Sequence, residues 1–274
     1  MITRRGFLGL MGAVAAAAMG LGCAENKPAT NAAPTPTPTP SAKFSEVPWP
    51  YEKLDPDYVA DLAYDSYMHH HCMYGVVNAV VKALAEKVGE PYSSFPTMIT
   101  VYGKAGVSGW ATLCGALNGA AMVCYMVLPE KEADEVINDL FSWYEYTSLP
   151  TYVPKKPVKS DLSPFPKSKA DSPLCHVSVS NWCKSSGYKA FSKEREERCG
   201  RLTASVAKKL VEMLNDVKAG TFVPKYPLDN VTMKCRACHC KGSSLQDTRG
   251  KMACWECHTK NITLIDEMEG HPKV

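Results

Sequence analysis

The sequence lacks the features that would assign it to several common functional classes. It has no glycine-rich nucleotide-binding motif and no recognisable pair of nucleophile and base. Its formal net charge is only +3, too small to predict a nucleic-acid partner. Its apolar stretch at residues 10–21 is too short for a stable membrane span. The chemistry of the chain therefore has to come from its 12 cysteines and 7 histidines.

Two Cys-x-x-Cys-His motifs lie near the end of the chain, at residues 235–239 and 254–258. In c-type haem attachment, two thiols add to the porphyrin vinyl groups and the adjacent imidazole binds the iron. Two copies so close together predict two covalent haems. The expected attachment residues are Cys235, Cys238, Cys254 and Cys257, and the expected proximal iron ligands are His239 and His258.

A structural zinc ribbon is the alternative for the same segment. Without the histidines, the spacing is C-x2-C-x15-C-x2-C, which suits four thiolates around zinc. A zinc ribbon has no use for a histidine after each cysteine pair, whereas haem uses both. The sequence therefore favours haem, and a zinc-stabilised exported binding module stays open as the non-redox reading.

The N-terminus indicates export. Arg4 and Arg5 precede the short apolar stretch, as in twin-arginine signals, so residues 1–23 are predicted to be a signal and the protein to be periplasmic. Cys23 stands where a lipoprotein would be lipidated, and simple cleavage nearby is the alternative. Residues 24–48 are rich in Pro and Thr and predict a semi-rigid tether, which would hold a lipidated protein near a membrane.

Apolar residues recur at helical spacing from Pro56 onwards, so the fold is predicted to be mainly α. A helical, cysteine-rich domain is expected over residues 49–222, followed by a small irregular dihaem segment over 223–274. Small residues such as Gly115 and Gly119 would allow another backbone or a cofactor to approach closely. The expected helices are 72–88, 110–128, 133–146 with its Glu and Asp residues in water, and a helix capped by Ser192 that ends near Lys218; residues 147–173 are expected to form a loop.

Several of the remaining cysteines lie at or near the ends of these helices. Four soft thiolates are what an iron-sulfur cluster requires, although the spacing matches no ferredoxin motif. Twin-arginine export carries folded proteins, usually with a cofactor already inserted, which favours a cluster over disulfides or buried thiols. The candidate ligands are Cys72, Cys114, Cys175, Cys183 and Cys199, and a 2Fe-2S cluster is the expected form.

The helical part resembles a family of redox-active proteins defined by a first Cys, a Gly/Cys/Ala-x-x-Gly segment and two later Cys. Here these are Cys72, residues 114–119, Cys175 and Cys199, with Cys183 an additional thiol that could replace Cys72 or Cys175. With two haem motifs fused to it, the chain is similar to the split-Soret cytochrome c family over residues 50–274. The resemblance implies a homodimer, two haems packed close together and an iron-sulfur centre in a separate helical domain.

The sixth ligand of each haem iron separates an electron carrier from an enzyme, because a protein ligand there blocks substrate. The histidine candidates are His69, His70, His71, His176 and His271, with Met233 and Met252 as weaker ones. At most one or two residues of the run at 69–71 can face one site, since successive helical residues point about 100° apart. We expect a ligand from this run, either to this chain's haem or to that of a partner subunit; an exposed polar patch is the alternative. The sequence therefore predicts an electron-transfer protein, with a haem oxidoreductase open on one face as the alternative.

Overall fold

A computed structural model describes residues 46–258. The predicted signal, Cys23, most of the Pro/Thr-rich segment and His271 lie outside the described residues. Within residues 46–258 the structure is mainly α, as predicted, with isolated bridges Leu113–Leu174 and Leu149–Ser168 in place of any strand. None of the helices in this part of the chain is long and apolar enough to cross a membrane. The helices are α1 (Pro56–Val88), α2 (Gly115–Val127), α3 (Glu130–Tyr146), α4 (Cys175–Ser186), α5 (Lys193–Lys218), α6 (Asn230–His239) and α7 (Trp255–His258), with 3-10 helices η1 (Tyr92–Ser94) and η2 (Thr97–Gly103).

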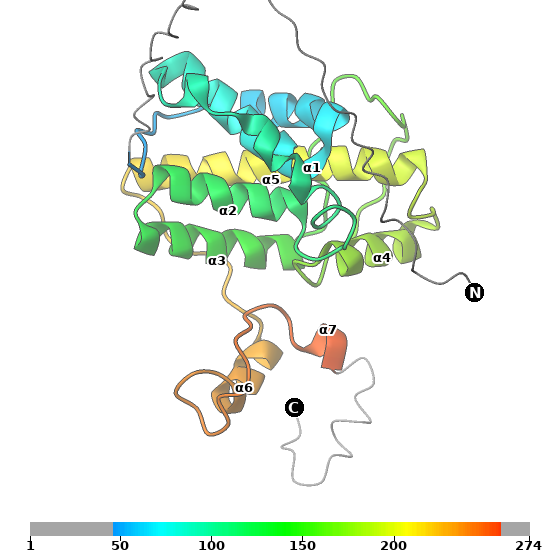
Figure 1. Cartoon of the computed structure of the whole chain (residues 1–274). Helices are drawn as coiled ribbons and strands as arrows, with labels where there is room; N and C mark the ends of the chain where they lie inside the picture. Colours follow the sequence, from blue (N-terminus) through cyan, green and yellow to red (C-terminus); the bar gives the residue numbers. More distant parts are fainter. Residues whose placement is uncertain (1–45, 259–274) are drawn as a thin grey trace, which may run out of the picture. The chain divides into compact units, whose positions relative to one another are not determined.

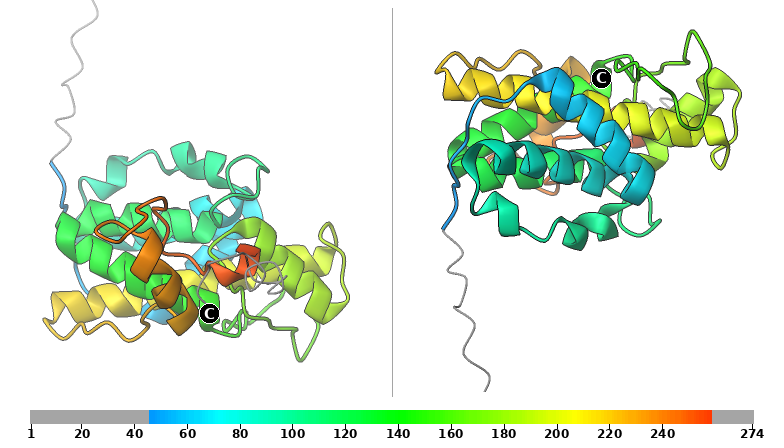
Figure 2. Two further views of the ribbon diagram at one scale, coloured as in Figure 1. Left: turned by 90° about the horizontal axis from the view of Figure 1, so that it is seen from below. Right: turned by 90° about the horizontal axis from the view of Figure 1, so that it is seen from above.

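Helix α1 is long but broken. The side chain of Asp55 caps its first turn, and Pro56 is its first residue. Proline is tolerated there because the N–H of the first residue makes no hydrogen bond within the helix. His70 and His71 leave the helical conformation, and His71 has φ 67° and ψ −166°, a region that favours glycine. Figure 2 shows the two halves of α1 running in different directions. The break therefore lies immediately before Cys72.

The core is formed by α1, α2, α3 and α5. Helix α1 packs on α5 and α2, and α2 packs on α3 and α5 (Figure 1). Close approach depends on small residues, as the sequence predicted. A Cβ atom at Gly119 would lie 2.8 Å from the carbonyl oxygen of Met73, and one at Gly75 would lie 2.7 Å from a methyl group of Thr203. Glycine is therefore needed where α1 meets both α2 and α5.

Helices α3 and α5 follow the predicted amphipathic pattern with one correction. Ser192 caps α5 by accepting a hydrogen bond from Arg195 N (3.2 Å), as expected. On α3, however, Asp139 and Glu145 are buried, whereas all its acidic residues were expected in water. Asp139 Oδ1 accepts hydrogen bonds from the backbone N–H groups of Lys225 and Tyr226, each 2.6 Å long. Asp139 therefore holds the segment that follows α5.

Some boundaries differ from the predictions. The helix expected from Trp110 begins only at Gly115, because residues 105–111 include several positive φ angles that no helix accommodates. Helix α4 was not predicted, since its polar sequence has no clear apolar period. Residues 147–173 contain no helix, as expected. The segment expected to be irregular contains α6, which Asp229 caps through the N–H groups of Val231 and Thr232.

Candidate metal centres

Four of the five candidate cluster ligands come together. Cys72 follows the break in α1, Cys114 is the N-cap of α2, Cys175 is the first residue of α4 and Cys199 lies in the second turn of α5. Each of these four thiols interacts electrostatically with the other three. Residues far apart in the sequence thus form one group of sulfur donors.

Local structure explains why the thiols meet. Cys114 N donates to Pro173 O (2.9 Å) and Cys175 N donates to Thr112 O (2.7 Å), so the starts of α2 and α4 are fastened together. Gly115 makes room for Cys72, because a Cβ atom at this position would overlap the Cys72 sulfur. The Cys-Gly pair at 114–115 therefore supplies one thiol and admits a second.

Cys183 differs from the other four. It lies two turns after Cys175 on α4, and of the four grouped thiols it interacts with that of Cys199. Cys124 is fully buried within the core, where burial raises the pKa of its thiol. The geometry thus favours Cys72, Cys114, Cys175 and Cys199 as the ligand set and leaves Cys183 at its edge.

Burial makes the free thiols hard to ionise. It raises the pKa of Cys72 to about 12, and it also raises the pKa values of Cys114 and Cys175. Metal ions bind the thiolate form, so a bound cationic group would have to displace these protons. Two groups at this site were missed by the sequence analysis. Tyr144, which interacts with Cys114, donates to Ser178 Oγ (2.8 Å), and Arg198 Nη1 lies 3.9 Å from the Cys199 sulfur.

Helix α6 presents the first Cys-x-x-Cys-His motif. Cys235 and Cys238 lie about one turn apart and His239 ends the helix. His239 Nδ1 lies 2.8 Å from Asp247 Oδ1, and the hydrogen bond to His239 lowers the pKa of that carboxyl. The loop is held by Leu245 N, which donates to Cys238 O (2.9 Å), and by Thr248 N, which donates to His239 O (3.1 Å). A partner on Nδ1 orients an imidazole and makes Nε2 the nitrogen for a metal.

The second motif begins beside the first. Cys254 N donates to Thr232 Oγ1 in α6 (3.3 Å), and the Cys254 thiol interacts with that of Cys235. His258 is exposed at the end of α7. The Cys257 side chain lies outside the described residues. The first cysteines of the two motifs are therefore neighbours.

A buried carboxylate joins the second motif to α3. Ala253 N donates to Glu145 Oε1 (3.2 Å), and Glu145 is only 2% exposed. Burial raises the pKa of Glu145 from 4.5 to about 7. Between pH 4.5 and about 7, the folded state therefore keeps a proton on Glu145 that the unfolded state loses. As the pH rises through this range, Glu145 makes folding less favourable.

Glu145→Gln should remove this pH dependence. Glutamine keeps an acceptor for Ala253 N–H but cannot ionise, so we expect equal stability at pH 4 and a variant more stable by up to about 3 kcal/mol at pH 8. Denaturant unfolding at several pH values measures this difference. Glu132→Gln, at an exposed position of the same helix, is the control and should follow the wild type. Parallel curves for wild type and Glu145→Gln would contradict the assignment.

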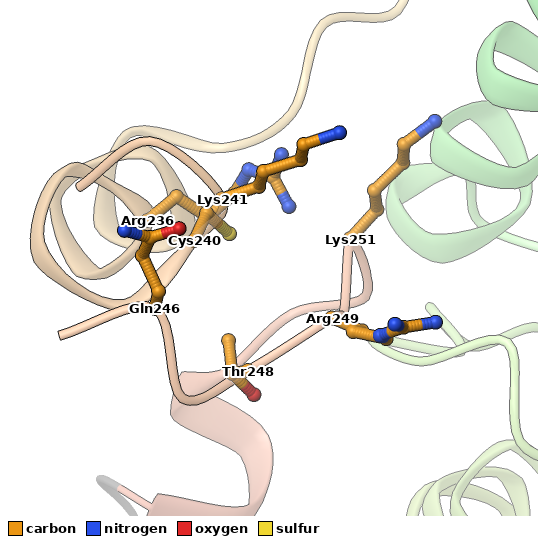
Figure 3. A pocket seen from close by; sticks show the side chains of 7 residues that line it. All are labelled: Arg236, Cys240, Lys241, Gln246, Thr248, Arg249 and Lys251. Atoms are coloured by element: carbon orange, nitrogen blue, oxygen red, sulfur yellow. The ribbon is translucent and has the colours of Figure 1, made fainter.

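A basic cavity of about 630 Å³ lies next to α6 (Figure 3). Figure 3 shows Arg236, Cys240 and Lys241 on one side, with Thr248, Arg249 and Lys251 on the segment opposite. Four of its seven lining side chains are cationic and none is acidic. The cavity is therefore suited to an anionic group held close to the first motif. Its lining residues are Arg236, Cys240, Lys241, Gln246, Thr248, Arg249 and Lys251.

The described distal-ligand candidates lie in three parts of the chain: the break in α1, the start of α4 and the haem-motif segment. His69 Nδ1 is 2.9 Å from Asp65 O, the His70 ring packs against Tyr74 with centroids 4.9 Å apart, and His71 packs against Tyr67 at 5.8 Å. His176, which directly follows Cys175, is exposed, as are His69 and His71. Met233 and Met252 are exposed in the haem-motif segment. The contacts given for the rings of His69, His70 and His71 are all to residues of α1.

These features define a class of protein: a helical protein that combines a group of four thiols with two c-type haem attachment motifs, as is typical of redox proteins. Comparisons with known proteins agree. Residues 74–213 match the family described as "Putative redox-active protein (C_GCAxxG_C_C)". The chain is 37% identical over 269 residues to split-Soret cytochrome c of Desulfovibrio desulfuricans, covering 95% of each protein.

A solved structure is also similar. It is described as "A novel iron centre in the split-Soret cytochrome c from Desulfovibrio desulfuricans", and the two chains share 39% identity with a TM-score of 0.72. The match covers 82% of this chain and 95% of that one. The chain belongs to the split-Soret cytochrome c family, as its motifs predicted.

Proposed function

We propose that the protein is a periplasmic electron carrier with two covalently bound c-type haems and an iron-sulfur cluster. The observation that carries the proposal is the juxtaposition of the two motifs, in which the Cys254 thiol reaches that of Cys235. Haem and cluster supply one-electron chemistry when bound. The chain's part is to hold these groups close together, so that electrons pass between them without a substrate.

The chain's residues suit haem better than zinc at the two motifs. Asp247 holds His239 Nδ1, which would leave Nε2 as the nitrogen available to a haem iron, a role that a zinc ribbon does not need. The cations around the cavity next to α6 would neutralise the propionates of a haem attached at Cys235 and Cys238. His258 would have the same role as His239 at the second haem.

The four-thiol group supports the iron-sulfur cluster. Among residues 46–258, no three His, Cys, Asp or Glu side chains converge closely enough to hold one metal ion. A cluster can bind thiols that lie farther apart than the ligands of a single ion, because bridging sulfides separate its irons. The Desulfovibrio relative is described as having a novel iron centre. We place a centre of the 2Fe-2S type between Cys72, Cys114, Cys175 and Cys199.

Assembly and location complete the proposal. The exposed His69 and His71 reach outward from the break in α1, which suits a distal ligand given to the haem of a partner subunit in a homodimer. The twin-arginine signal would export the folded helical domain with its cluster, and haem would be attached outside. Lipidation of Cys23 would add a membrane tether, and cleavage near it would leave the protein free.

Spectroscopy and metal analysis test the proposal directly. We expect two haems per chain, acid-labile sulfide, non-haem iron and six-coordinate low-spin haem spectra. A high-spin fraction that shifts with added ligand would instead indicate the oxidoreductase, and a colourless protein that contains zinc would indicate the binding module. Iron equal to the haem content, with no sulfide, would exclude the cluster.

A further inference from the structure

Arg198 is a buried cation next to the four-thiol group. It is 1% exposed. Its Nη2 donates to Ser178 Oγ (2.8 Å) and its Nη1 lies 3.9 Å from the Cys199 sulfur. Its Nε atom is buried without a hydrogen-bond partner. No carboxylate within residues 46–258 forms an ion pair with it.

Such a side chain is costly to bury. A guanidinium stays charged in proteins, so it cannot escape the penalty by losing a proton. A buried charge is ordinarily paired, because its desolvation is otherwise uncompensated. Arg201, one turn later on α5, shows the ordinary arrangement. It is 3% exposed and its Nε pairs with Glu197 Oε1 at 2.7 Å.

The negative charge that would balance Arg198 is at the metal site. The nearby groups able to carry one are Cys199, Tyr144 and Cys114. Four thiolates outweigh the positive charge of a two-iron core, which makes the loaded centre an anion. Its reduction by one electron adds a further negative charge.

We propose that Arg198 is the built-in counter-cation of this centre and raises its reduction potential. The inference rests on the proposed iron-sulfur centre and adds a residue that sets the potential of that centre. The guanidinium attracts the reduced centre more strongly than the oxidised one, because the reduced centre is more negative. Arg198 acts through charge and one weak contact to Cys199, so it is not itself a ligand.

Arg198→Met, Arg198→Lys and Arg201→Met test the inference in the loaded full-length protein. A redox titration followed by electron paramagnetic resonance measures the potential of the centre. We expect Arg198→Met to lower the equilibrium constant for reduction at least tenfold, about 59 mV for one electron. Arg198→Lys should keep most of the wild-type potential. Arg201→Met combined with Glu197→Gln should leave the potential unchanged, because it removes an ion pair that carries no net charge.

Stability gives a second readout that a merely structural role would not produce. Metal-free Arg198→Met should be at least as stable as the metal-free wild type, since an uncompensated buried charge is gone, whereas the loaded variant should release its iron faster. Metal-free Arg201→Met should be destabilised, because it leaves the buried Glu197 without its cation. Should Arg198→Met assemble no centre, Arg198→Gln, which keeps a donor for Ser178, carries the same expectation for the potential.

The outcomes separate the two proposals. A sulfide-containing Arg198→Met or Arg198→Gln protein with the wild-type potential would overturn the role of Arg198 and leave the centre in place. Wild-type protein without acid-labile sulfide would overturn the centre, and with it the inference. A metal-free Arg198→Met protein destabilised as much as Arg201→Met would indicate a structural role.

Discussion

Replacing Cys254 and Cys257 with serine should lower the mass of the mature protein by that of one haem and halve its haem absorbance per chain. The thioether bonds form only with these thiols, so the second tetrapyrrole would not be retained covalently. The first motif has its own pair on α6 and its own histidine held by Asp247, so its haem should remain. Mass spectrometry and a haem stain of the denatured protein measure the loss.

Cys240→Ser is the matched control. Cys240 directly follows His239 in the sequence and lines the basic cavity, but it is not part of either motif. This variant should keep both haems. The prediction fails if the double substitution leaves the mass unchanged, or if the wild type carries no covalent tetrapyrrole and zinc is bound instead.

Cys199→Ser should abolish the iron-sulfur centre and leave both haems attached. Cys199 is the thiol that interacts with all three other predicted ligands and with Cys183. Serine binds iron poorly where a soft thiolate is required, so we expect at least a tenfold fall in acid-labile sulfide per chain. Sulfide and non-haem iron analysis on the purified variant measures this directly.

Cys183→Ser serves as the control because it changes the same chemistry at the edge of the group. Its sulfide content should equal that of the wild type. If Cys183→Ser loses the centre while Cys72→Ser or Cys175→Ser keeps it, Cys183 is the fourth ligand in place of that residue. The geometry predicts that Cys183→Ser keeps the centre and that Cys72→Ser and Cys175→Ser lose it.

The sequence predicted the family better than it predicted the geometry. Metal-ligand motifs are local, so the candidate haem residues could be read directly from two pentapeptides. The break at His70 and His71 could not, because it depends on how α1 packs between α2 and α5. The selection of four cysteines out of five also required the fold, since only the pairing of residues 111–114 with 173–176 brings Cys114 and Cys175 together.

Buried charges were missed for a related reason. Arg198, Asp139 and Glu145 lie on amphipathic helices, where a charged residue is ordinarily assigned to water. Each has a hydrogen-bond partner outside its own helix. The partner is Ser178 for Arg198, the backbone at 225–226 for Asp139, and Ala253 for Glu145. The sequence does contain one indication that Arg198 lies near the thiol group, because Arg198 directly precedes the candidate ligand Cys199.

The four sulfur donors come from α1, α2, α4 and α5, so one inorganic group would cross-link most of the helical core. Such a cross-link shortens the free loops of the unfolded chain and raises the free energy of unfolding. Removal of iron by a chelator should consequently loosen the contacts between these helices together. The segment from Asn230 onwards provides none of the four thiols. The two proposed haems could therefore be attached to it after the cluster has cross-linked the helical core.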